Sequence, residues 1–473
     1  METVIHLMIW GLSIAVGVVA VADYLRGRVE ALSLRNVSLL GFLIFMVWSA
    51  HVGLRFDPNS SYMLADPTGT VFKWLLWCAL FLLLYLIAYR MGFGSKAIAR
   101  ILPAPTATIG PVSAWPLIAM LTGLGLLLKI VPIPLIGVLT TMTAVGLASV
   151  SAGIAGWVWG PRLFNPVFAL LGGVTVLANA YVANYGEFGR RPLVSVGACL
   201  IWGMYYSSFR TMRLPSMAGR IALVAIPPMI LFGLYSSVRS WDTIGTTAVV
   251  TEMFTQGDAT QSLREVGEQD TARIGQWLME YTERGAYETR PLFSIAYFFM
   301  YPIPRDFFGV LGYEKPYPIS TQMADLSNRQ GVKRGATGVT NPAGIVGNTF
   351  AEGGLIAIVA YAIAGAFIFR LGDEFVRRNV SSAFLVLPVG ASLGQVLGIP
   401  RGESSVFMFH FVWTSISVTV LMLMASAVIT RVFPQLVAAD QNTLDSEAAA
   451  SEWSASESYY ESYEDYDEAY ASR

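Results

Sequence analysis

Apolar residues in this chain gather in long blocks of roughly 18 to 22 residues, separated by short polar clusters. A helix rises 1.5 Å per residue, so one such block crosses the roughly 30 Å of hydrocarbon in a bilayer. Hydrophobic residues make up 54% of the chain and charged residues only 13%, which is about half the charge density of a soluble domain. The sequence therefore predicts an all-α, polytopic membrane protein with about eleven spanning helices.

The blocks divide the chain into four regions. We expect an N-terminal bundle of about eight spanning helices over residues 1–238 and a large extracytoplasmic loop over 239–342. About three C-terminal spanning helices follow over 343–430, and a cytoplasmic tail covers 438–473. The predicted spans are 3–22, 37–54, 71–90, 112–129, 132–151, 163–182, 193–209, 221–238, 343–369, 381–399 and 405–430.

The short loops differ in their content of Lys and Arg, which predicts the orientation of the chain. Cytoplasmic loops carry an excess of these residues. The basic set is Arg26, Arg28, Arg35, Arg90, Lys96, Arg100, Arg210, Arg213, Arg220, Arg370, Arg377 and Arg378. The alternate loops hold fewer, with Arg55, Lys129, Arg190, Arg191 and Arg401. We therefore expect the N-terminus outside and the C-terminus in the cytoplasm.

Two pieces of the large loop carry structural signals. Ile274, Trp277, Leu278 and Tyr281 follow the spacing of an amphipathic helix. The stretch 292–304 is apolar and aromatic but too short to span, which favours a re-entrant or interfacial segment.

The tail over 438–473 has ten Asp and Glu residues and one Arg, so we expect it to be disordered. Five tyrosines lie among these acids. By analogy with the tails of tyrosine kinases that regulate polysaccharide export, we hypothesise that they are phosphorylated, and a kinase or a chain-length regulator is the candidate partner. The alternative is a tail that only aids solubility.

Familiar catalytic motifs are absent from the sequence. Cys78 and Cys199 lie inside apolar blocks, and the three histidines are scattered. No spacing suggests a metal site, a cofactor or a nucleic-acid partner. Arginines remain, in and around the large loop, and arginine grips phosphate groups in a bidentate manner. The loop also holds twelve acids, so the alternative is simple ion pairing at a solvated surface.

Two short motifs add to these arginines. Arg401-Gly-Glu403 lies in a turn between two predicted spans, where charge is costly unless it faces a cavity or a partner. A Gly-rich approach from Arg334 leads into a span that carries Asn348 and Glu352 on one helical face. Glu352 is a candidate base. The alternatives are an ion pair at a helix end and a Gly-mediated packing face with a buried acid.

The chain resembles the bacterial oligosaccharide repeat-unit polymerases, the Wzy-type enzymes of O-antigen, capsule and exopolysaccharide assembly. The resemblance covers residues 285–430. It rests on the stretch from Arg290-Pro to Pro302-Ile-Pro-Arg305, on Gly347-Asn-Thr-Phe-Ala-Glu352-Gly-Gly, and on Arg401-Gly-Glu403.

This resemblance implies a GT-C-like, metal-independent glycosyltransferase that needs no cofactor. Its donor would be a glycan on undecaprenyl pyrophosphate, elongated at the outer face of the cytoplasmic (inner) membrane. We expect arginine to stabilise the leaving pyrophosphate and a carboxylate to act on the acceptor hydroxyl. The candidate pyrophosphate ligands are Arg290, Arg305, Arg334 and Arg401, with Asn348 as a further substrate contact. The candidate bases are Glu352, Glu403 and Asp306.

Three other functions fit parts of the pattern. An O-antigen ligase would use the same arginines with another acceptor. A flippase for lipid-linked oligosaccharides is a transporter, and transporters commonly have two related halves. A membrane scaffold would recruit partners through its tail and would leave the outer arginines without a role.

Overall fold

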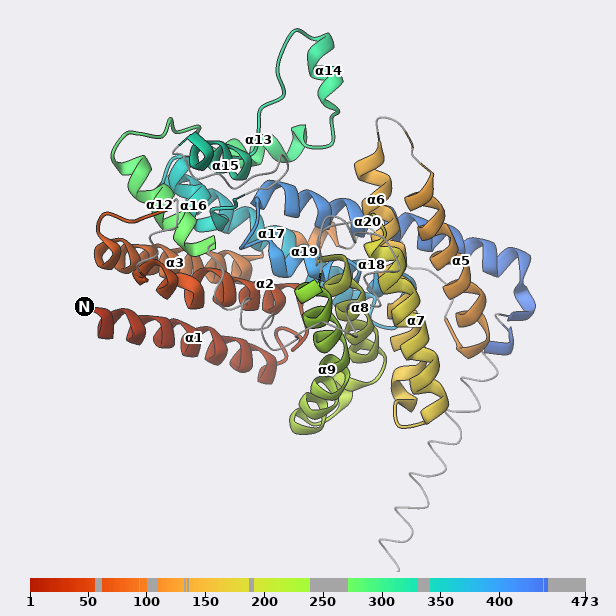
Figure 1. Cartoon of the computed structure of the whole chain (residues 1–473). Helices are drawn as coiled ribbons and strands as arrows, with labels where there is room; N and C mark the ends of the chain where they lie inside the picture. Colours follow the sequence, from red (N-terminus) through yellow and green to blue (C-terminus); the bar gives the residue numbers. More distant parts are fainter. Residues whose placement is uncertain are drawn as a thin grey trace, which may run out of the picture.

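The long apolar blocks fold into membrane-length helices in the computed structural model, which describes residues 1–55, 62–92, 94–99, 109–131, 133, 136–186, 191–238, 271–329, 341–436 and 438–440. The described part is all helical (Figure 1). Eight of its helices are long and apolar enough to cross a membrane. These are α1 (Glu2–Leu25), the continuous stretch from α2 (Leu34–Phe42) through Leu54, α3 (Pro67–Met91), α5 (Pro111–Ile130), α6 (Gly137–Trp159) extended to Arg162, α7 (Pro166–Asn184), α17 (Leu355–Arg378) and α20 (Ser404–Val432).

A polytopic, all-helical membrane protein is thereby confirmed, and the count of about eleven spans stays a prediction. The three other predicted spans correspond to α8 (Arg191–Ser207), to α9 (Leu214–Val238) and to the pair α18 (Ala383–Gly390) and α19 (Leu393–Gly398). The predicted single span over 343–369 is wrong in detail. It is divided into α16 (Gly344–Ala351) and α17, because Gly353 and Gly354 between them have positive φ angles of 114° and 60°.

Helix α6 lies at the centre of one group of helices, where it packs against α5, α7 and α8. Gly156 and Gly203 allow this close approach, because a Cβ atom on either would lie 2.2–2.3 Å from a backbone oxygen of the facing helix. The second group contains α1, α2, α3 and α17, with α17 packed along α3. The short helices α18 and α19 join the groups, since they contact α8 on one side and α2 and α20 on the other.

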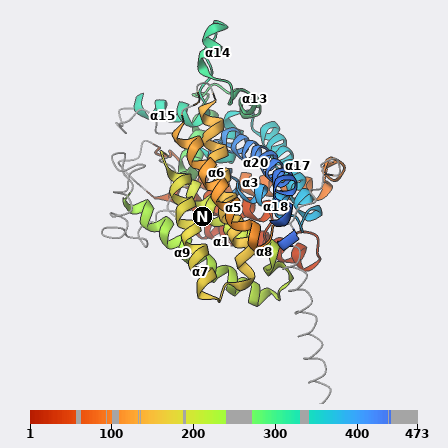
Figure 2. The same cartoon turned by 90° about the vertical axis from the view of Figure 1, so that its right-hand side faces the viewer.

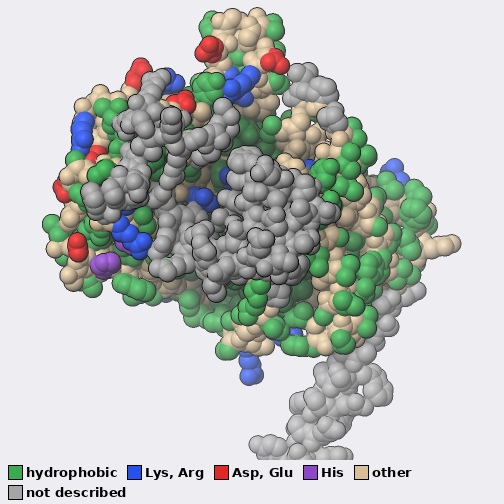
Figure 3. Space-filling view, in the orientation of Figure 1, with side chains coloured by type: hydrophobic (Ala, Val, Ile, Leu, Met, Phe, Trp, Pro, Cys, Tyr) green, Lys and Arg blue, Asp and Glu red, His purple; other side chains and the backbone are tan. Residues whose placement is uncertain are grey.

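Short helices of the predicted large loop lie together at one end of the molecule (Figures 1 and 2). They are α12 (Thr271–Glu283), α13 (Phe293–Met300), α14 (Arg305–Val310) and α15 (Ile319–Arg329). The predicted amphipathic helix is confirmed as α12, whose Ile274, Trp277 and Leu278 are buried. Figure 3 shows charged side chains at the top and along the left side of the molecule, whereas hydrophobic side chains predominate on its right side.

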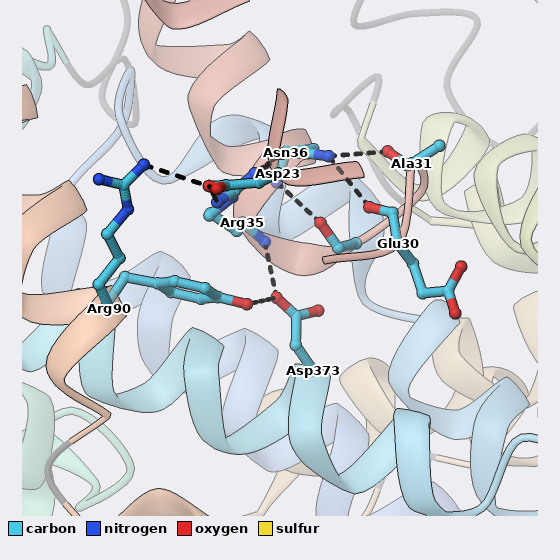
Figure 4. A network of polar contacts seen from close by, with 9 residues as sticks. Asp23, Glu30, Ala31, Arg35, Asn36, Arg90 and Asp373 are labelled. Carbon is cyan, nitrogen blue, oxygen red and sulfur yellow. Dashed lines mark hydrogen bonds and ion pairs between the residues drawn. The ribbon is translucent and has the colours of Figure 1, made fainter. Parts of the chain in front are cut away.

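A buried polar network joins the helices α1, α2, α3 and α17 (Figure 4). Arg35 Nη1 lies 2.6 Å from Asp23 Oδ2, and both side chains are at most 2% exposed. The Asp373 carboxylate accepts the backbone N–H groups of Leu34 and Arg35 at 2.7 and 3.2 Å, and the Tyr89 hydroxyl at 2.7 Å. Asp23 lies in α1, Tyr89 in α3 and Asp373 in α17, so this network fixes three spans relative to α2.

Residues from the basic segments after the first, third, seventh and ninth predicted spans meet at this end. Arg90 lies 3.5 Å from Asp23, and Arg210 lies 3.7 Å from Glu30. The end of α17 contributes Arg377, which is 2.8 Å from Glu374. Helix α17 has 24 residues, so its two ends are about 36 Å apart at 1.5 Å per residue. The basic network and the layer of short helices therefore lie at opposite ends of the bundle.

The prediction of disorder from residue 438 is wrong for residues 438–440, which the structure describes as helical. Asp440 is fully buried, and its carboxylate accepts the N–H groups of Gly110, Val112 and Ser113 at 3.2, 2.8 and 3.1 Å. A carboxylate is a favourable cap for the N-terminus of a helix, here α5. Residues 441–473, with the five tyrosines and the predicted partner site, lie outside the described residues.

We expect Arg35→Leu to destabilise the protein by about 3 kcal/mol, because it removes the buried partner of Asp23 and leaves only the exposed Arg90 at 3.5 Å. The double variant Asp23→Asn/Arg35→Leu should recover most of this loss, and the exposed Arg26→Leu should change little. Thermal denaturation of the purified protein measures all three. Equal melting of the single and double variants would contradict the pairing.

Candidate functional site

The break between α16 and α17 places Glu352 at the candidate site. Glu352 follows the last residue of α16, and the two glycines after it turn the chain into α17. The segment before α13 pairs with this break. Arg290 N–H donates to the carbonyl oxygen of Ala351 at 3.2 Å, and Leu292 N–H donates to that of Glu352 at 3.1 Å. The glutamate side chain is thus fixed at the start of α13.

Hydrogen-bond donors surround the Glu352 carboxylate, which belongs to a side chain only 1% exposed. Ser294 donates its backbone N–H at 2.7 Å and its hydroxyl at 2.6 Å. The Tyr361 hydroxyl of α17 donates to the same oxygen as the Ser294 N–H. Ser294 lies in the first turn of α13, where unpaired N–H groups favour an anion.

Glu403 lies next to this cluster, immediately before α20. Its carboxylate is 3.3 Å from the Ser294 hydroxyl and 3.4 Å from the Ser405 hydroxyl, and it accepts the Ser320 N–H of α15 at 3.0 Å. The Ser294 hydroxyl therefore lies between two buried carboxyl groups. This contact joins residues that are 58 and 109 positions apart in the sequence.

Electrostatically, the pair is unusual because both carboxyl groups are buried. Burial raises the pKa of the Glu352 carboxyl to about 8, with a further rise from Glu403, while the hydrogen bonds from Ser294 oppose the shift. Burial also raises the pKa of Glu403, against the hydrogen bonds from Ser320. Glu352 lies before the first residue of the span α17, and Glu403 lies before the first residue of the span α20, so both are outside these spans. A carboxyl group with a pKa near neutrality is suited to take and return a proton.

Basic side chains lie on the chain segments that adjoin this acidic pair. Arg290 is exposed, and Arg305 lies with its guanidinium carbon 4.2 Å from the centre of the Tyr317 ring. Arg401 is half-buried, 5.6 Å from the centre of the Phe45 ring. Lys315 donates to the carbonyl oxygens of Tyr301 and Ile303 at 2.8 and 2.7 Å. Burial, together with the charge of Arg305, lowers the pKa of Lys315.

A cavity of about 230 Å³ adjoins the pair. Its walls are almost entirely apolar and aromatic, with Phe81, Phe298 and Phe369 among them. Ser294 and Tyr361, the two residues that hold the Glu352 carboxylate, form part of the same wall. The site therefore combines a polar, acidic end with an apolar chamber, the combination that binds molecules with one polar and one apolar part.

The predicted site residues are distributed unevenly over this arrangement. Glu352 and Glu403 both contact the Ser294 hydroxyl, and the backbone N–H of Arg290 donates to the carbonyl oxygen of the residue before Glu352. Asp306 is exposed in the first turn of α14 and makes no hydrogen bond or ion pair with another described residue. Arg334 lies outside the described residues.

Asn348 was expected to share a helical face with Glu352. It lies in α16 and is 1% exposed, and both atoms of its side-chain amide are without a hydrogen bond to the described part of the chain. Glu352 lies beyond the end of α16 and points to Ser294, so the shared helical face does not hold at that position. An unsatisfied buried amide is costly in a protein interior.

Sequence reasoning missed Ser294, Tyr361 and Lys315. Ser294 is the one polar side chain between Leu292 and Met300 apart from the tyrosine hydroxyl of Tyr297. That isolated serine was a usable signal. Lys315 carried no comparable signal, because its position over the Tyr301 carbonyl depends on the fold of the segment between α14 and α15.

Comparisons with known proteins give no relative: the chain matches no protein-family model, no curated protein and no solved structure.

We expect the stability of the protein to fall with rising pH because of Glu352. In the folded protein the pKa of Glu352 is raised from its ordinary value of 4.5 to about 8. The stability that the protonated carboxyl group contributes is therefore fully present below pH 4.5 and is lost as the pH rises to about 8. Melting temperatures measured across this range should decline less in Glu352→Gln than in the wild type. The exposed Glu288→Gln serves as the control. Parallel curves for wild type and Glu352→Gln would refute a proton held at Glu352.

Proposed function

We propose that this protein transfers glycan from a lipid-linked pyrophosphate donor and polymerises lipid-linked oligosaccharide repeat units. The observation that carries the proposal is the placement of Glu352: a buried carboxyl group of raised pKa, beside an apolar cavity, with the backbone of Arg290 bonded to the preceding residue. A polyprenyl pyrophosphate has an apolar chain and an anionic headgroup. The cavity suits the chain, and arginine suits the pyrophosphate.

In the proposed reaction the acceptor hydroxyl attacks the anomeric carbon of the donor glycan. The bond from that carbon to the pyrophosphate oxygen breaks, and the lipid pyrophosphate leaves with the electron pair. Glu352 takes the proton of the attacking hydroxyl. Arg290, Arg305 and Arg401 stabilise the charge that develops on the leaving group, a contribution that grows in a site with little water.

Orientation in the membrane supports an outer site. If the basic network around Arg35 faces the cytoplasm, as the positive-inside rule favours, the layer α12–α15 faces outward. The N-terminus is then outside, since Asp23 at the far end of α1 belongs to the network. Helix α5 begins shortly after the basic segment that contains Arg100, so its N-terminus would be on the cytoplasmic side. Asp440 caps this N-terminus, which would place Asp440 and the tail in the cytoplasm as well. A GT-C-like fold and a cytoplasmic (inner) membrane location are part of this proposal.

A flippase is the second candidate, and the divided helices favour it. Discontinuous helices α16/α17 and α18/α19 resemble those at the substrate sites of transporters, where they occur in both halves of the fold. Here both breaks lie in the C-terminal part of the described chain. This asymmetry supports an enzyme over a transporter with two related halves.

The proposal is tested by complementing cells that lack the gene with the wild type, Glu352→Gln, Arg305→Ala or Arg284→Ala. We expect Glu352→Gln and Arg305→Ala to abolish long polymer while single lipid-linked repeats persist, since loss of one electrostatic stabiliser lowers a rate by about 10²–10³. Arg284→Ala is the matched control. Arg284 is an exposed arginine of the same layer, paired with Glu280 at 2.9 Å. It should restore full-length polymer.

Other glycan profiles would point elsewhere. Normal polymer in the Glu352→Gln cells would exclude the proposed role of this residue. Repeats trapped on the cytoplasmic face would indicate the flippase. Long polymer that accumulates on the lipid carrier without reaching its final acceptor would indicate a ligase.

A further inference from the structure

Ser294 has one hydroxyl proton and faces two carboxyl groups. Its Oγ atom lies 2.6 Å from Glu352 Oε1 and 3.3 Å from Glu403 Oε1. A serine hydroxyl donates one hydrogen bond and accepts others. Both contacts are therefore hydrogen bonds only if one of the glutamates carries a proton and donates it to Ser294.

Among the described residues, no cation pairs with either carboxyl group to allow both to be ionised. In the part of the chain that the structure describes, neither glutamate forms an ion pair, and their contacts are hydroxyl and backbone N–H groups. Two buried anions so close together repel each other, and burial penalises each of them. The ionisable groups on the surrounding elements include Tyr287 and Arg290 before α13, Tyr297 in α13, Arg305 in α14, Lys315 before α15, Tyr361 in α17, and Arg401 and His410 on either side of the start of α20.

We propose that Glu352 and Glu403 share a single proton through the Ser294 hydroxyl, and that Ser294 and Glu403 are positioning residues that set the proton affinity of Glu352. In one arrangement Glu403 donates to Ser294, and Ser294 donates to the Glu352 carboxylate. In the other, Glu352 donates to Ser294, and Ser294 donates to the Glu403 carboxylate. Conversion of one arrangement into the other moves one proton from a glutamate to the serine oxygen and one from the serine oxygen to the other glutamate, so atoms and charge balance.

The shared proton deepens the proposed function. Its catalytic role rests on that proposed function. A base must hold its proton neither too weakly nor too tightly at the working pH. The negative charge on Glu403 strengthens proton binding at Glu352, and the Ser294 donor weakens it. The pair would thus act as a base when the shared proton lies on Glu403: Glu352 is then a carboxylate, takes the proton of the acceptor hydroxyl, and both carboxyl groups are protonated afterwards.

The two partners act on Glu352 in opposite directions, which gives a test that needs no substrate. Purified full-length protein in lipid nanodiscs is titrated with pH while the infrared band of protonated carboxyl groups is recorded. The component lost in Glu352→Gln reports this residue. We expect its midpoint near pH 8 in the wild type, lower by about one unit or more in Glu403→Gln, and higher in Ser294→Ala. Glu288→Gln, an exposed acid nearby, should leave it unchanged.

Unchanged midpoints in Glu403→Gln and Ser294→Ala would overturn the proposal, as would shifts of the same sign in both. Ser294→Ala keeps both acids and decides the matter if Glu403→Gln does not fold. Because no glycan is present, the result is independent of the proposed transfer. Shifts of opposite sign in a protein without transferase activity would support the shared proton and reject the function. Transfer with unchanged midpoints would do the reverse.

Discussion

The two-glycine break after Glu352 is the constraint on which the candidate site depends. A continuous helix would keep the Glu352 side chain on the face of α16. Positive φ angles at Gly353 and Gly354 end that helix instead, and the freed carbonyl groups of Ala351 and Glu352 bind the segment that starts α13. Ser294 then meets Glu352 and Glu403 at once. A Cβ atom at either glycine would be strained in this conformation, so the site is encoded in the backbone as much as in the acids.

Charge is separated between the two ends of the bundle. At one end Arg35, Asp23 and Asp373 form a compact network in which charged groups have partners. At the other end two acids are buried, and their partners among the described residues are hydroxyl and N–H donors. Buried ion pairs contribute little net stability, but they fix the relative positions of elements. The first end is thus suited to hold spans together. The second keeps a titratable group next to an apolar cavity, a combination typical of functional sites.

The sequence predicted the class of fold and part of the site, and the reasons differ. Block length predicts a membrane helix because the bilayer sets that length, and the spacing of Ile274, Trp277 and Leu278 predicts α12 because one face is buried. Arg401-Gly-Glu403 and the Gly-rich approach were singled out separately, and the structure brings their glutamates to one serine. Glycine is common in membrane helices, so the break within 343–369 could not be read from composition. Nor could Asp306 be separated from the buried acids, since burial is a tertiary property.

The central claim is that the protein itself elongates a lipid-linked glycan. The most direct measurement incubates the purified full-length protein in nanodiscs with a single repeat unit on a polyprenyl pyrophosphate and resolves the products by length. The account predicts chains of two or more repeats, with one free lipid pyrophosphate released per bond formed. Single repeats that stay unchanged, while the same protein in liposomes moves the lipid across the bilayer, would contradict it.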